Sequence, residues 1–131
     1  MTPVETAEHY VGMLDDHSRL EIQKLQSANP SVEALWQAYG KRLGELATGE
    51  EPEQRARKAF KERLSELRRA LCESDNVQAV IKDPAVASQF DLAAVLAGKL
   101  LESRFGGVNL VVIAVLVSRI GLNKICSGED L

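Results

Sequence analysis

The 131-residue chain is poor in cysteine, proline and aromatic residues, and each shortage excludes a class of protein. Two cysteines are too few for the disulfide framework of a small secreted domain. Four prolines and nine glycines exclude a collagen-like or low-complexity chain. No apolar run reaches the roughly 20 residues that span a bilayer. What remains, 45% hydrophobic and 27% charged residues, is typical of a globular protein.

The sequence also lacks signals that direct a chain out of the cytoplasm. Residues 1–10 contain no basic segment followed by an apolar stretch, so we expect no signal peptide. Because a chain with so few cysteines suits a reducing compartment, we expect a cytoplasmic protein. Cys72 and Cys126 are then expected to be two small buried apolar side chains. Their spacing leaves a disulfide between them open, because the distance between the Cα atoms decides it.

Helix-breaking residues divide the chain into lengths that suit helices. Pro30, Pro52, Pro84 and the glycine pair at 106–107 are the strongest of them. The chain has no internal repeat and no low-complexity segment. The sequence therefore predicts an all-α fold, a single compact bundle of five to six helices that forms one domain over residues 1–131.

Capping patterns predict where the first helices begin. Thr2 and Glu5 form a capping box around a proline at the first helical position. Ser18 and Glu21 repeat the pattern within the apolar stripe of residues 3–28. These residues are therefore predicted to form either one bent helix or two short ones.

Later boundaries follow from the same residue preferences. Asn29, with the proline after it, is predicted to cap a helix that ends at Gly49. A short helix is predicted over residues 76–82 and a longer one over residues 90–104. Asn109 is predicted to cap the last helix, which runs to about Cys126.

The segment 54–71 is the clearest amphipathic helix. Its apolar residues fall within an arc of about 80° on a helix. They are Ala56, Phe60, Leu64, Leu67 and Leu71. The segment also holds seven basic residues against two acidic ones. Its predicted basic face consists of Arg57, Lys58, Lys61, Arg68 and Arg69.

The segment 108–117 has a composition that favours a strand. Nine of its ten residues are apolar and most are β-branched. However, no second strand is predicted, and a buried strand without a partner would leave its backbone groups unsatisfied. We therefore predict a helix buried on most sides. Together with the preceding helix it forms a hydrophobic hairpin over residues 92–126.

Several conspicuous residues have structural interpretations. Trp36 and Tyr39 lie on an apolar stripe and are expected in the core. Gly98 and Gly121 lie inside predicted helices, where the lack of a side chain lets another helix approach closely. His17 is expected to pack at the edge of the first apolar stripe.

No arrangement of residues predicts a catalytic, metal-binding or cofactor-binding site. Glu5, His9 and Asp16 share a helix face, but that face is opposite the apolar stripe, where charged residues are expected anyway. Motifs for nucleophilic catalysis, phosphate binding and dinucleotide binding are all absent. We expect no enzyme, no metal and no cofactor.

The charge distribution is the positive argument for function. Acids outnumber bases in the first fifty residues, whereas 54–71 is basic. The sequence predicts a non-catalytic protein-interaction module, an adaptor or regulator. It would bind a protein partner or itself, and head-to-tail contacts between copies would give a ring or filament. The predicted acidic face consists of Glu8, Asp15 and Asp16.

Three other functions are alternatives to this one: nucleic-acid binding, membrane activity, and the binding or conversion of a small ligand. A net charge of −3 argues against nucleic acid as the partner. A membrane-active bundle that uses the 92–126 hairpin is the first alternative. A small-ligand binder or enzyme without a recognisable motif is the second. For the basic face, we expect Arg57→Glu with Arg68→Glu to abolish partner capture and leave the helical circular dichroism intact.

Overall fold

A computed structural model describes residues 2–43, 51–105 and 109–128, and all regular structure within these ranges is helical. The predicted all-α class is therefore confirmed, but nine helices occur in these ranges instead of five or six. They are α1 (Pro3–Gly12), α2 (Asp16–Ala28), α3 (Val32–Arg42), α4 (Pro52–Leu71), α5 (Asp75–Lys82), α6 (Pro84–Gln89), α7 (Leu92–Glu102), α8 (Leu110–Ile120) and α9 (Leu122–Cys126). No helix in the described part of the chain is long and apolar enough to cross a membrane.

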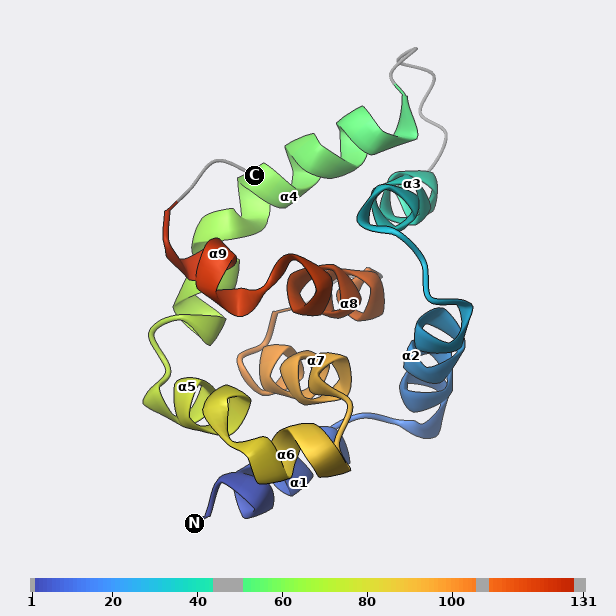
Figure 1. Cartoon of the computed structure of the whole chain (residues 1–131). Helices are drawn as coiled ribbons and strands as arrows, with labels where there is room; N and C mark the ends of the chain where they lie inside the picture. Colours follow the sequence, from blue (N-terminus) through green and yellow to red (C-terminus); the bar gives the residue numbers. More distant parts are fainter. Residues whose placement is uncertain (1, 44–50, 106–108, 129–131) are drawn as a thin grey trace.

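Helix α8 lies at the centre of the molecule (Figure 1), in contact with α2, α3 and α7. Residues 110–117 are all buried. A helix satisfies its backbone groups internally, and one that is apolar on every side is stable only when it is enclosed. The prediction that this β-branched segment is a buried helix is confirmed. Helices α7 and α8 pack together as the predicted hydrophobic hairpin.

The first 28 residues form two helices. Both hydrogen bonds of the predicted capping box are present between Thr2 and Glu5. The second helix is capped one turn before the predicted box, because the Oδ1 of Asp15 accepts a hydrogen bond from the backbone N–H of Ser18 at 2.7 Å. This bond lowers the pKa of Asp15. His17 is exposed, so the packed position predicted for it is wrong.

Two predicted helix ends are wrong, and a third, at Asn109, is confirmed in position but not in its hydrogen bond. Asn29 ends α2 in the left-handed conformation (φ 47°), and Ser31 caps α3 through its side chain. Asn109 precedes α8, but its side chain makes no capping hydrogen bond. The predicted last helix is broken at Gly121, whose φ of 103° ends α8 and starts α9. The predicted stops at Gly49 and at 106–107 lie outside the described residues.

The amphipathic helix α4 agrees with its predicted pattern. Phe60, Leu67 and Leu71 are buried, and Leu64 is partly buried against the core. Trp36 and Tyr39 of α3 are also buried, as predicted. Helices α3 and α4 therefore pack closely against each other.

Two glycines allow backbones to touch. A Cβ atom added to Gly98 would lie 1.8 Å from the carbonyl oxygen of Tyr10, so α7 and α1 are in backbone contact. A Cβ atom at Gly40 would lie 1.8 Å from the carbonyl oxygen of Pro52 at the start of α4. The predicted role of Gly98 in close helix approach is confirmed.

Cys72 and Cys126 form a disulfide, with their Cα atoms 5.6 Å apart. The prediction of two separate apolar side chains is therefore wrong. Cys72 is the residue directly after α4, and Cys126 is the last residue of α9, so the bond joins the ends of these two helices. The expectation of a reducing compartment rested on the small number of cysteines, and a disulfide between the two does not support it.

Candidate functional site

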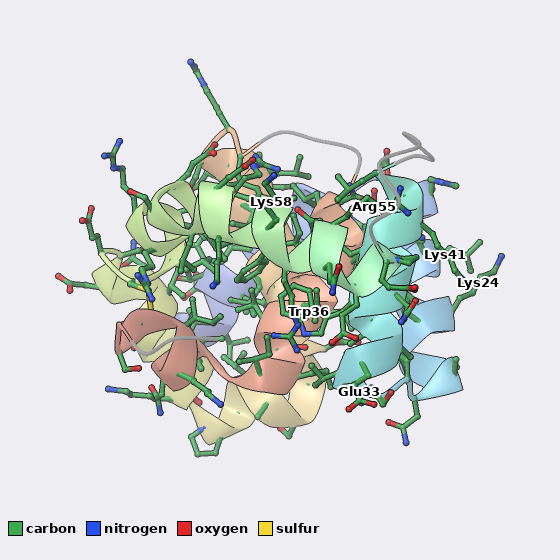
Figure 2. All side chains as sticks on the ribbon, turned by 90° about the horizontal axis from the view of Figure 1, so that it is seen from above. Lys24, Glu33, Trp36, Lys41, Arg55 and Lys58 are labelled. Atoms are coloured by element: carbon green, nitrogen blue, oxygen red, sulfur yellow. A yellow bond between two sulfur atoms is a disulfide. The ribbon has the colours of Figure 1, made fainter. Side chains whose placement is uncertain are left out.

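The predicted basic residues of α4 lie in three different environments. Lys58 and Lys61 are exposed on the side of α4 that faces away from the core (Figure 2 labels Lys58). Arg57 and Arg68 are half-buried and make contacts within the molecule. Arg69 is also exposed, and it lines a separate cavity. The exposed part of the predicted face therefore consists of Lys58, Lys61 and Arg69, and the two lysines are the ones that do not line that cavity.

Arg57 is held in place by two neighbours. Its Nε donates a hydrogen bond to the Oε1 of Glu53 at 3.2 Å, one helical turn away. Its guanidinium carbon also lies 4.9 Å from the ring centroid of Trp36. Phe60 supports the same indole edge-on, with the ring centroids 5.2 Å apart. Arg57 therefore has a fixed orientation beside a buried aromatic pair.

Arg68 fastens α9 to α4. Its Nε donates a hydrogen bond of 2.8 Å to the carbonyl oxygen of Ile125. The disulfide between Cys72 and Cys126 lies next to this bond. Two independent links therefore hold α9 against the last turn of α4, although α9 has only five residues.

A small pocket opens between α3, α4 and the C-terminal helices. It has a volume of about 160 Å³ and is lined by Val32, Trp36, Arg57, Ile120 and Lys124. Two of these side chains carry positive charge and the other three are largely apolar. An anion with a short apolar part fits this lining, because a cation attracts its charge and the indole and aliphatic groups contact its carbon atoms.

The predicted acidic face is exposed. Glu8, Asp15 and Asp16 are all open to solvent, and Asp16 makes only a long ion pair of 3.7 Å with Arg19. Helix α1 lies at the opposite end of the molecule from α4, with α7 and α8 between them (Figure 1). The structure therefore leaves the three predicted acids exposed, and Glu8 on α1 lies far from the basic residues of α4.

His9 pairs with a residue far along the chain. Its Nε2 lies 2.9 Å from the Oε2 of Glu102, whose other oxygen accepts a hydrogen bond from Lys99 at 3.2 Å. Burial raises the pKa of Glu102, but the hydrogen bonds from Lys99 and His9 outweigh it and hold that pKa below its ordinary value. Among the described residues, no group of three or more potential metal ligands occurs.

Sequence reasoning missed the contribution of α9 to this site. Lys124 lies in α9 and reaches the pocket after the chain turns at Gly121, where the disulfide ties α9 to the end of α4. The glycine and the second cysteine were visible, but nothing in their spacing indicated a turn. Comparison of the chain with protein-family models, with characterised proteins and with solved structures finds no match.

Proposed function

We propose that the protein is a non-catalytic protein-interaction module that binds a second copy of itself head to tail. The exposed lysines of α4, Lys58 and Lys61, would contact the acidic face of Glu8, Asp15 and Asp16 on the next copy. The observation that supports this is the exposure of opposite charges at opposite ends of one molecule.

Separation of the two faces favours contact between molecules over contact within one. Helices α7 and α8 lie between α1 and α4, so the acidic face of a molecule cannot reach its own lysines (Figure 1). A pairing between copies leaves one face open at each end. Such contacts close into a ring or continue as a filament, depending on the angle between copies.

The pocket beside Trp36 supplies an anchor point that α4 lines with Arg57, the residue before Lys58. Interfaces draw most of their binding energy from a few residues, among which tryptophan and arginine are enriched. Arg57 is already oriented by Glu53, so less side-chain entropy is lost when it binds a carboxylate. A carboxylate from the partner would meet Arg57 and Lys124 there.

Charge reversal of the exposed lysines tests this proposal. We expect Lys58→Glu with Lys61→Glu to abolish self-association in sedimentation velocity, and high salt to weaken that of the unaltered protein. Neither lysine makes an ion pair with the described residues, so the fold should be preserved. Arg57 and Arg68 are unsuitable for this test, because reversing them would break the contacts with Trp36 and Ile125.

A matched control changes the net charge equally elsewhere. Lys24→Glu with Lys41→Glu reverses two exposed lysines on α2 and α3 (Figure 2) and should leave self-association unchanged. The reciprocal variant, Glu8→Lys with Asp16→Lys, should be monomeric alone but form complexes with the Lys58/Lys61 variant. A monomer at every concentration and salt for the unaltered protein would refute self-association. Equal loss in the control would refute the assigned surface.

A further inference from the structure

A second and larger cavity lies beside the C-terminal half of α4, and neither Lys58 nor Lys61 lines it. Its volume of about 410 Å³ lies within the range of roughly 300–1,000 Å³ that is typical of small-molecule sites. It is bounded by the C-terminal half of α4, the start of α5 and the end of α7. The lining consists of Glu66, Arg69, Ala70, Glu73, Ser74, Lys99, Ser103 and Phe105.

The cavity carries charges of both signs on facing elements. Glu66 and Glu73 come from α4 and the turn after it, whereas Lys99 comes from α7. Arg69 adds a second cation at the α4 side. Two carboxylates and two cations leave the lining without net charge, so it has no general attraction for a simple anion or a simple cation.

Lys99 is positioned before any ligand arrives. Its side chain is only 15% exposed. Its Nζ donates a hydrogen bond to Glu102 at 3.2 Å and lies 5.6 Å from the ring centroid of Tyr10. An ammonium group has three N–H donors, so others remain available after the bond to Glu102.

The carboxylates of Glu66 and Glu73, across the cavity from Lys99, can still accept hydrogen bonds from a ligand. Among the described residues, Glu73 makes no ion pair, and Glu66 makes only a long one of 3.6 Å with Arg63. The guanidinium of Arg63 is stacked on Phe105, 3.8 Å from the ring centroid, which fixes the apolar end of the cavity. Ser74 and Ser103 add hydroxyl groups between the two walls.

We propose that this cavity binds a small zwitterion of the α-amino-acid type. Its carboxylate would be bound by Lys99 and Arg69, its ammonium group by Glu73 and Glu66, and its apolar side chain would lie against Ala70 and Phe105. A ligand that carries both charges gains charge-assisted hydrogen bonds to the cations and to the carboxylates of the lining, whereas an ion of one sign gains only one of these two sets. The inference is independent of self-association, because it uses none of the lysines assigned to that contact.

Three probes that differ by one charged group test the proposal. L-Leucine has both groups, 4-methylpentanoate lacks the ammonium, and 3-methylbutylamine lacks the carboxylate. In ¹H–¹⁵N NMR titrations of the full chain at constant ionic strength, we expect only L-leucine to shift the amides of residues 66–75 and 99–105 with saturation. Equal affinity for either single-charge probe, or no shift with any of the three at high millimolar concentration, would overturn the proposal.

A charge-neutral variant locates the binding. Arg69→Gln with Glu73→Gln removes one exposed charge of each sign, and we expect it to weaken L-leucine binding by about tenfold or more, the value of one charge-assisted hydrogen bond. Lys24→Gln with Glu33→Gln makes the same exchange on α2 and α3 (Figure 2) and should leave the affinity unchanged. Equal weakening in both variants, or in neither, would overturn the assigned site.

Discussion

The backbone contact at Gly98 gives the sharpest prediction for the fold. In Gly98→Ala, the new methyl group would lie 1.8 Å from the carbonyl oxygen and 2.3 Å from the carbonyl carbon of Tyr10. Ordinary contact begins at 3.4 Å, so α1 must move away from α7 by roughly the difference, about 1.6 Å. Both atoms belong to the backbone, and a change of rotamer cannot relieve the contact.

The expected cost follows from two opposing effects. Overpacking of a close-packed core costs about 1–3 kcal/mol, and a forced backbone shift lies at the upper end of that range. Alanine is a better helix former than glycine by about 1 kcal/mol, which offsets part of the cost. We therefore expect Gly98→Ala to lower the free energy of unfolding by about 2 kcal/mol.

Urea unfolding followed by circular dichroism measures this difference. Gly12→Ala is the matched control, because Gly12 is the last residue of α1 and a Cβ atom there meets nothing within 4 Å. That variant should be neutral or stabilised by up to about 1 kcal/mol. If both variants unfold at the same urea concentration, the close contact between α1 and α7 is wrong.

Two further predictions concern covalent and charged links. The disulfide joins residues 54 apart in sequence. By restricting the unfolded chain, a loop of this length stabilises the folded state by about 4 kcal/mol. Reductant should lower the urea midpoint of the unaltered protein to that of Cys72→Ser with Cys126→Ser and leave the variant unaffected; an unchanged midpoint would exclude the bond. The pKa of Glu102 is held below its ordinary value of 4.5, so its ionised form stabilises the fold above that pH, and the contribution is lost as the pH falls through the lowered pKa. Thermal unfolding should show Glu102→Gln less stable by about 0.5 kcal/mol at about pH 6, and this difference should shrink as the pH falls through the lowered pKa; a difference that does not shrink in acid would contradict this role.

Periodic patterns predicted the helical elements because they depend on short-range geometry. The apolar stripe of α4 and the capping box at Thr2 follow from spacings of three and four residues, and both are present. The β-branched composition of α8 favours a strand. A helix was predicted because no second strand was available to satisfy its backbone hydrogen bonds. The N-cap of α3 could not be predicted from residue type, because Asn29 and Ser31 are both good N-cap residues. The backbone conformation decides between them: Asn29 ends α2 and Ser31 caps α3.

Which residues line the candidate site is decided by contacts between segments that are distant in the sequence. The helical periodicity of α4 predicts that Arg57 and Arg68 are surface charges. In the structure, however, Arg57 contacts Trp36 and Arg68 donates a hydrogen bond to Ile125. The pairing of Cys72 with a residue in α9 depends on a turn that sequence spacing does not reveal. Charge patterning located the exposed lysines and acids, and the tertiary fold determined which cations remain available.

The central position of α8 has a consequence for the unfolded chain. Residues 110–117 contain no charge, no proline and no glycine, and seven of these eight residues are valine, isoleucine or leucine. Segments of this kind stack readily between chains as cross-β assemblies. The helices packed against α8, which include α2, α3, α7 and α9, therefore shield this segment from other chains, and conditions that loosen their packing should expose it to aggregation.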